Sequence, residues 1–145
     1  MDIMVRRAST GDESVACNAA RSFKGAAISA SQARAFLANP ANYLIIAEVD
    51  GDLAGFVLAY RLERLDRAAR QLFVYEVAVA RPYQRQGVGT ALMQFIRDLV
   101  RAEKLMEAFV FTSRDNTPAI DLYAGTGAAV EGDASLCFVY PGAAA

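Results

Sequence analysis

The spacing of apolar residues along the chain separates strands from helices. Residues 72 to 80 are apolar at nearly every position, which is typical of a strand buried on both faces. A polar loop follows, and then apolar residues recur at the helical spacing i, i+4, i+7, i+8 and i+11: Val88, Leu92, Phe95, Ile96 and Leu99. The pattern predicts a central strand and then an amphipathic helix that begins at Gly87 and ends near Lys104.

The other elements are predicted from capping residues, turn residues and β-branched runs. We expect helices from Ser9 or Thr10 to about Phe23, from Ser31 to Asn39-Pro40, and over residues 117 to 124. We expect strands over residues 3–7, 43–49, 53–60, 108–112, 129–131 and 136–140. Asp50-Gly51 favours a hairpin turn between the second and third of these strands. The order predicts an α/β fold, with one mixed sheet of about seven strands flanked by four helices.

Length and composition exclude several classes of protein. The chain has 145 residues, enough for one domain with a sizeable core, and we expect a single domain over residues 1–145. No apolar run approaches the ~20 residues of a membrane span, and no secretory signal is visible. Cys17 and Cys137 lack the close spacing of metal or redox motifs, so we expect free thiols in a reducing cytoplasm. The absence of histidine excludes Ser-His-Asp and Cys-His catalysis and most zinc sites, so no metal site is expected.

The charges are unevenly distributed along the chain. The net charge of −1 argues against a nucleic-acid-binding protein. Residues 81 to 104 hold five cations and two acids, whereas residues 115 to 145 hold four acids and no Lys or Arg. The first segment suits a phosphorylated ligand and the second suits a cationic one, although solvated surface charge would give the same distribution.

The loop between the central strand and the following helix has the composition of an anion site. The first N–H groups of a helix lack partners, and the helix dipole adds positive charge there. Gly87 and Gly89 remove side chains that would keep a phosphate from this backbone. The loop is neither a Walker loop nor a dinucleotide-binding Gly-x-Gly-x-x-Gly. Its sequence, Gln84-Arg85-Gln86-Gly87-Val88-Gly89, resembles the pyrophosphate loop of the GCN5-related N-acetyltransferases, Gln/Arg-x-x-Gly-x-Gly/Ala.

A second segment is similar to the other signature of that family, Asn-x-x-Ala-x-x-Leu-Tyr-x-x-x-Gly-Phe. It runs from Asn116 to Gly127 and supplies the Asn and the Tyr, here Tyr123. The closing aromatic residue of the signature is replaced by Ala128. The two matches come in the family's order, and the predicted elements match the family's fold over the whole chain.

The resemblance implies acetyl-CoA as the acyl donor. The amides of residues 85 to 90 would hold its pyrophosphate, with Arg81 or Arg85 adding charge, and the edge of the central strand would bind the pantetheine arm. Asn116 would contact the pantetheine, or would serve only as a helix N-cap. The residues expected to bind the cofactor are Val77, Ala78, Val79, Gln84, Arg85, Gln86, Gly87, Val88, Gly89, Thr90 and Asn116.

The chemistry requires a base, because a protonated amine has no lone pair to attack a thioester. Glu76, a carboxylate within an apolar strand, is the candidate; alternatively it is a core glutamate paired with an arginine. Tyr123 matches the family's tyrosine that protonates the leaving thiolate, or it is a packed core tyrosine. A backbone N–H near Val77 would polarise the thioester carbonyl.

Three stretches carry a narrower resemblance within the family: Tyr75-Glu76-Val77-Ala78-Val79, Arg85-Gln86-Gly87 with Thr90-Ala91-Leu92, and Pro118-Ala119 with Leu122-Tyr123. They are similar to the gentamicin-type aminoglycoside 3-N-acetyltransferases, which tend to carry an acid at the position of Glu76. A polycationic sugar agrees with the acidic C-terminal segment, where Asp115, Glu131 and Asp133 are expected to bind substrate together with Glu76. The alternatives are an acetyltransferase for another amine (a polyamine, an amino acid or a protein N-terminus) and an acyl-CoA-binding module without turnover. The resemblance also allows a homodimer.

Overall fold

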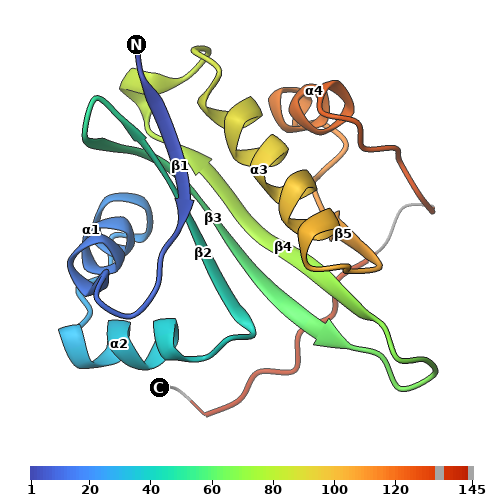
Figure 1. Ribbon diagram of the computed structural model, residues 1–145. Helices are drawn as coiled ribbons and strands as arrows, with labels where there is room; N and C mark the ends of the chain where they lie inside the picture. The colour runs from blue at the N-terminus through green and yellow to red at the C-terminus, as the bar shows by residue number, and fades with distance from the viewer. Residues whose placement is uncertain (133–135, 144–145) are drawn as a thin grey trace.

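A computed structural model describes residues 1–132 and 136–143, and its framework is a five-stranded sheet (Figure 1). The strands lie in the order of the sequence: β1 (Ile3–Arg7), β2 (Asn42–Val49), β3 (Asp52–Glu63), β4 (Arg70–Val79) and β5 (Glu107–Val110). Neighbouring strands are antiparallel, except for β4 and β5, which are parallel. The sheet is therefore mixed, as the sequence predicts.

Helices cover both faces of this sheet. The helices are α1 (Glu13–Lys24), α2 (Ala30–Ala38), α3 (Val88–Ala102) and α4 (Thr117–Gly125), and a short 3₁₀ turn, Arg81–Tyr83, precedes α3. Figure 1 shows α1 and α2 on one face and α3 and α4 on the other. The predicted mixed sheet with four flanking helices is confirmed.

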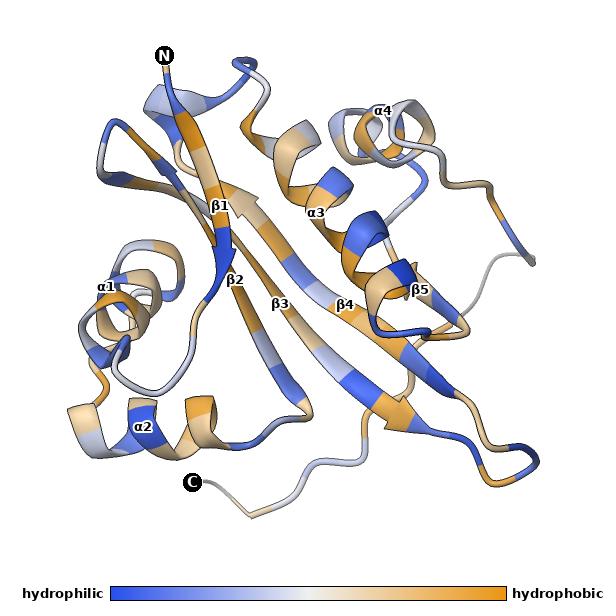
Figure 2. Cartoon of the chain, in the orientation of Figure 1, coloured by the Kyte–Doolittle hydropathy of each residue, from blue (hydrophilic) through white to orange (hydrophobic). Residues whose placement is uncertain are grey.

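Two apolar cores lie on opposite faces of the sheet, and β2 shows how its sequence serves both. Tyr43, Ile45 and Ala47 belong to the core beneath α3, whereas Leu44 and Ile46 belong to the core beneath α1 and α2. This alternation follows from the two-residue period of a strand. Figure 2 shows the apolar residues concentrated where the sheet and the helices meet. Burial of both strand faces explains why β2 is a continuous apolar run in the sequence.

The predicted hairpin turn is confirmed, whereas two helices begin at other residues than predicted. Asp50 and Gly51 join β2 to β3, and both have positive φ (50° and 89°), as a type I′ turn requires. The predicted helix caps are wrong by a few residues. Asp12, rather than Ser9 or Thr10, precedes α1, and its carboxylate accepts a hydrogen bond from the Ser9 N–H at 2.8 Å. Ser29 rather than Ser31 caps α2, accepting the Gln32 N–H at 3.0 Å.

The sheet has five strands in the described residues, rather than about seven. Residues 129–131 and 136–140, predicted as the last two strands, form no strand there. Their large apolar side chains are almost fully exposed, with Val130 and Tyr140 each 94% exposed. A run of β-branched and aromatic residues predicts a strand only where a pleated surface covers its side chains. These segments lack such cover, so propensity alone is misleading for them.

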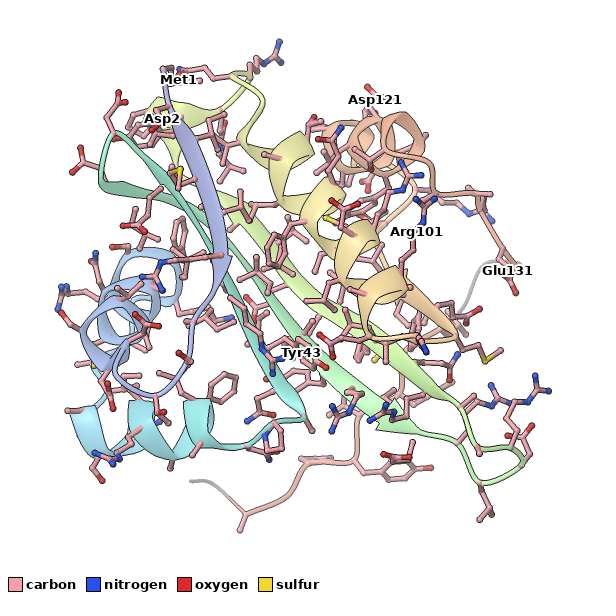
Figure 3. All side chains as sticks on the ribbon, viewed as in Figure 1. Met1, Asp2, Tyr43, Arg101, Asp121 and Glu131 are labelled. Atoms are coloured by element: carbon pink, nitrogen blue, oxygen red, sulfur yellow. The ribbon has the colours of Figure 1, made fainter. Side chains whose placement is uncertain are left out.

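None of the helices described has the length and hydropathy that crossing a membrane requires. The long helix α3 instead packs against the sheet through a buried stripe. Val88, Leu92, Ile96 and Leu99 are buried as the spacing predicts, whereas Phe95 is only partly buried and Met93 joins the stripe. Near the start of β2, the Tyr43 hydroxyl donates to Glu103 just after α3, at 2.7 Å (Figure 3). This contact fixes the end of α3 over the sheet.

Candidate active site

The two parallel strands separate near the middle of the sheet. β4 and β5 pair only from Gln71 opposite Glu107 to Val74 opposite Val110. Beyond Val74, β4 continues to Val79, paired with β3 on one side, while the chain after β5 turns toward α4. In the described part of the chain no strand pairs with the other edge of residues 75 to 79. Their backbone groups are therefore available to a ligand with an extended, strand-like backbone.

A β-bulge lies at the point where the strands separate. On β3, Leu58 pairs with Glu76 and the next residue, Ala59, pairs with Val74, so Tyr75 is the extra residue. Val74 and Val77 both pack toward α3, although they are three positions apart. The alternation of faces therefore slips at Tyr75 and Glu76, and both residues lie toward α1 and α2. Bulges commonly re-aim side chains in this way near active sites.

The predicted burial of this strand is partly wrong. In β4 only Leu72 and Val74 are fully buried, and Tyr75 is 56% exposed. Apolar residues on both faces do not show which positions are covered, and the face near the bulge lies open. The second half of the central strand is thus partly exposed, rather than buried throughout.

Glu76 is bound to a lysine from a distant part of the sequence. Both of its carboxylate oxygens accept hydrogen bonds from Lys24 Nζ, at 2.6 and 2.7 Å. The alternative of a core glutamate paired with an arginine is wrong in both respects, because the partner is lysine and 24% of the Glu76 side chain is exposed. Lys24 is the last residue of α1, so the ion pair joins this helix to β4. Sequence reasoning misses Lys24 as a residue of the site.

Aromatic rings form a continuous row beside Glu76. Tyr60 contacts Tyr75 edge to face with ring centroids 5.8 Å apart, and Phe36 contacts Tyr60 on its other side at 6.4 Å. The row continues from Tyr75 through Phe73 to Phe109 of β5, which stacks on Phe73 at 5.1 Å. The spacing of aromatic residues two apart in each of two neighbouring strands was the available signal for this row. Tyr60 and Tyr75 of this row lie near the carboxylate, and aromatic faces attract cations.

The loop that follows β4 presents backbone N–H groups. The N–H groups of residues 85 to 90 donate no hydrogen bond of ordinary geometry to another residue of the described chain. Two glutamine side chains support the loop from within. Gln84 Nε2 donates to the carbonyl of Val79 at 3.1 Å, and Gln86 Nε2 donates to the carbonyl of Pro82 at 3.0 Å. The loop therefore combines fixed geometry with free donors, which is the arrangement of an anion site.

The two glycines of the loop have different structural roles. Gly87 is the N-cap of α3 with φ of +88°, a conformation in which other residues are strained. Gly89 has ordinary φ, and a Cβ there would lie 3.3 Å from Leu122 of α4. Its missing side chain thus allows α3 and α4 to approach closely. Arg81 and Arg85 are exposed, and neither belongs to an ion pair among the described residues.

The acidic and amide residues near α4 are only partly gathered. Asn116 is the N-cap of α4, and its side-chain oxygen accepts the Ala119 N–H at 3.3 Å. Asp115 is exposed in the turn between β5 and α4. Glu131 follows α4, on the side of the sheet opposite to α1 and Lys24 (Figure 3), so the structure does not bring it together with Glu76. Asp133 lies outside the described residues.

Tyr123 lies on α4 beside a cavity of about 250 Å³ between α3, β5 and α4. The walls are mainly apolar, and Arg97 and Arg101 contribute the charged groups. Partial burial raises the pKa of Tyr123 above the ordinary value of a phenol. The hydroxyl therefore keeps its proton throughout the neutral range and can act as a donor. Ala128, which replaces the aromatic residue of the family signature, also lines this cavity.

Comparisons with known proteins agree with this architecture. A family model described as the acetyltransferase (GNAT) family matches residues 14–128. An N-alpha-acetyltransferase of Sulfurisphaera tokodaii is 32% identical over 92 residues, which are 57% of this chain and 53% of that protein. The L-2,4-diaminobutyric acid acetyltransferase of Nocardia farcinica is 37% identical over 81 residues, 55% of this chain and 40% of that protein. The chain thus aligns with about half, or less, of each relative.

Solved structures are similar in fold over nearly the whole chain. An aminoglycoside acetyltransferase, meta-AAC0020, from an uncultured soil metagenomic sample has a TM-score of 0.87 at 19% identity, covering 95% of both chains. A second one, HMB0005, from the same kind of source has a TM-score of 0.82 at 24% identity, covering 99% of this chain and 100% of that one. The ribosomal-protein-alanine N-acetyltransferase of Brucella melitensis has a TM-score of 0.73 at 20% identity, covering 95% and 100%.

The family match extends from within α1 to just beyond α4 and so includes both the loop and Tyr123. Enzymes of this family take their acyl group from acetyl-CoA. The matched segment forms most of the mixed sheet, including its separated parallel strands, and the loop at the start of α3. The chain therefore belongs to the acetyltransferase (GNAT) family.

Proposed function

We propose that this enzyme transfers the acetyl group of acetyl-CoA to an amine of an aminoglycoside, at the 3-N position. The observation that carries the proposal is the position of Glu76: a carboxylate at the bulge of β4, beside aromatic rings and at the opening between β4 and β5. A carboxylate with aromatic neighbours suits a cationic amine. Two structurally similar proteins are aminoglycoside acetyltransferases, which supports the choice of acceptor.

The loop before α3 fits the diphosphate of acetyl-CoA. It has unpaired N–H groups over residues 85 to 90 and the positive end of a helix of 15 residues. The exposed guanidinium groups of Arg81 and Arg85 add positive charge near the loop. The free edge of β4 at Val77 and Val79 would bind the pantetheine arm through backbone groups. Asn116 would contribute its side-chain N–H₂, since its oxygen already caps α4.

In the proposed reaction, bound acetyl-CoA supplies an activated acyl group as a thioester. Glu76 accepts a proton from the acceptor's ammonium and thereby frees the lone pair that attacks. The backbone N–H near Val77 stabilises the negative charge that develops on the carbonyl oxygen. Tyr123 donates its proton to the departing sulfur, and the second proton that the attacking nitrogen loses on forming the amide restores the phenol. Asp115 binds a second cationic group of the acceptor near the end of β5, and Glu131 and Asp133 add negative charge to the C-terminal segment.

A second acceptor class has its own support. Both sequence relatives above 30% identity have names that refer to other amines, an α-amino group and 2,4-diaminobutyrate. A thiol-release assay with acetyl-CoA separates the candidates when gentamicin, sisomicin, 2,4-diaminobutyrate, a polyamine and a short peptide are compared. Release with the aminoglycosides at the highest kcat/KM supports the proposal, and NMR of the product identifies the acetylated nitrogen. Release with another amine alone replaces the acceptor, and CoA binding without release identifies a non-catalytic module.

Tyr123→Phe is expected to lower kcat by about tenfold. The hydroxyl supplies the proton to the leaving sulfur, but a thiol with an ordinary pKa near 8.5 also departs as a thiolate, so the loss is smaller than for a base. The affinity for acetyl-CoA should change by less than twofold because the ring and its packing are retained. Steady-state kinetics and calorimetry measure the two quantities. A large loss of affinity with unchanged kcat would identify Tyr123 as a packing residue instead.

A further inference from the structure

The proposed base is already bound to an ammonium group within the same chain. Lys24 Nζ contacts both oxygens of Glu76, at 2.6 and 2.7 Å, so each oxygen already faces a positive charge. Tyr60 and Tyr75 stand close by. The pKa of Lys24 is raised, first by its hydrogen bond to Glu76 and further by these two tyrosines. Lys24 is therefore a charged ammonium in a setting of one carboxylate and two aromatic rings.

The two side chains of this ion pair differ in conformational freedom. Glu76 belongs to a strand paired with β3, and 24% of its side chain is exposed. Lys24 is the last residue of α1, followed by Gly25 in the left-handed conformation, and 47% of its side chain is exposed. A lysine at a helix end can turn its four-carbon stem into water, whereas a carboxylate on a paired strand has little freedom. The lysine is the partner that can leave.

The base cannot act while this lysine is in place. A carboxylate with both oxygens bound to an ammonium has its charge balanced, and a second ammonium beside it would meet like-charge repulsion. We propose that the Lys24 ammonium occupies the place of the acceptor's reactive amine, and that a cationic acceptor binds Glu76 by displacing it. This inference rests on the proposed function of Glu76. Lys24 is then an internal competitor, and it lowers the affinity of the site for the acceptor.

The displacement predicts a specific effect of removing the charge of Lys24. Lys24→Met keeps the unbranched stem and should lower the KM and the Kd for sisomicin by about two- to fivefold, the range to which the free energy of an exposed ion pair corresponds. Lys24→Arg retains a cation that can pair with Glu76 and should keep both values near those of the wild type. The affinity for acetyl-CoA serves as an internal reference in every variant.

Arg21→Met is the matched control. Arg21 lies one turn earlier on α1, and its guanidinium contacts the side chain of Asn18 rather than Glu76. The substitution removes one positive charge from the same end of the same helix. A general electrostatic effect would lower the KM for sisomicin equally in both methionine variants, and this outcome would overturn the inference. A decrease confined to Lys24→Met supports displacement.

Acceptor binding and turnover are measured separately, so that a failure of the displacement proposal can be distinguished from a failure of the proposed function. Sisomicin binding is measured by calorimetry with CoA present, and turnover is measured by thiol release. Tighter binding in Lys24→Met together with turnover supports both. Tighter binding without turnover in any variant supports displacement and removes the proposed function. Unchanged binding in Lys24→Met with normal turnover overturns displacement alone, and absence of binding in all variants overturns both.

Discussion

Glu76→Gln is expected to lower kcat for acetylation at pH 7 by about 10²-fold or more. The amide retains the size and hydrogen-bonding reach of the side chain but cannot accept a proton from the ammonium, and general bases contribute on this scale. The fold should survive, because the lost interaction is an ion pair at the surface of the sheet. Steady-state kinetics with a saturating acceptor measure the effect.

The pH dependence separates a base from a residue that only binds the acceptor. Solvent removes the proton from a growing fraction of the amine as the pH rises toward the ordinary amine pKa of about 10. The deficit of Glu76→Gln should therefore shrink steadily between pH 7 and pH 9. Glu63→Gln, an exposed carboxylate at the end of β3, makes the same chemical change away from the site and should be neutral. Wild-type turnover in Glu76→Gln, or a deficit independent of pH, would remove Glu76 from this role.

Local patterns predicted most of the framework because each element carries its own signal. The apolar run of β2, the Asp50-Gly51 turn and the buried stripe of α3 depend on neighbouring residues only. The bulge at Tyr75 left no such signal. A one-residue slip changes the face of every following side chain, but the pattern does not reveal it when both faces are apolar.

Contacts between distant segments account for the parts of the site that could not be predicted. Lys24 and Glu76 are 52 positions apart and meet only because α1 ends over the second half of β4. Asn116 illustrates the opposite situation. Its side chain caps a helix through a residue only three positions away, so its role as an N-cap was predicted as an alternative from the sequence. The residues of the anion loop are also local, since strand, loop and helix are consecutive. A motif confined to one loop can therefore be recognised in a sequence, whereas the surroundings of a carboxylate such as Glu76 cannot.

Thr90→Asp is expected to weaken acetyl-CoA binding by about ten- to a hundredfold while stabilising the fold. Thr90 is exposed at the third position of α3, where an added carboxylate favours the helix by roughly 0.3–1 kcal/mol through the helix dipole. The same carboxylate would stand beside the diphosphate that residues 85 to 90 are proposed to bind. Like charges separated by several Å at a protein surface repel by roughly 1–3 kcal/mol, which corresponds to the stated loss of affinity.

Because Thr90→Asp should weaken acetyl-CoA binding but stabilise the fold, a loss of binding caused by unfolding can be recognised. A variant that binds acetyl-CoA poorly because it is partly unfolded would melt at a lower temperature, whereas Thr90→Asp should melt at the wild-type temperature or above it. Thr90→Asn supplies the same shape without charge, and Gln94→Glu places a carboxylate on the exposed face of α3 beyond the first turn, where the dipole effect has decayed. Both controls should bind acetyl-CoA within about twofold of the wild type, because neither brings a negative charge to the loop. Equal affinities of Thr90→Asp and Thr90→Asn for acetyl-CoA would mean that the diphosphate is held elsewhere, and the backbone N–H groups of the loop would then need another ligand.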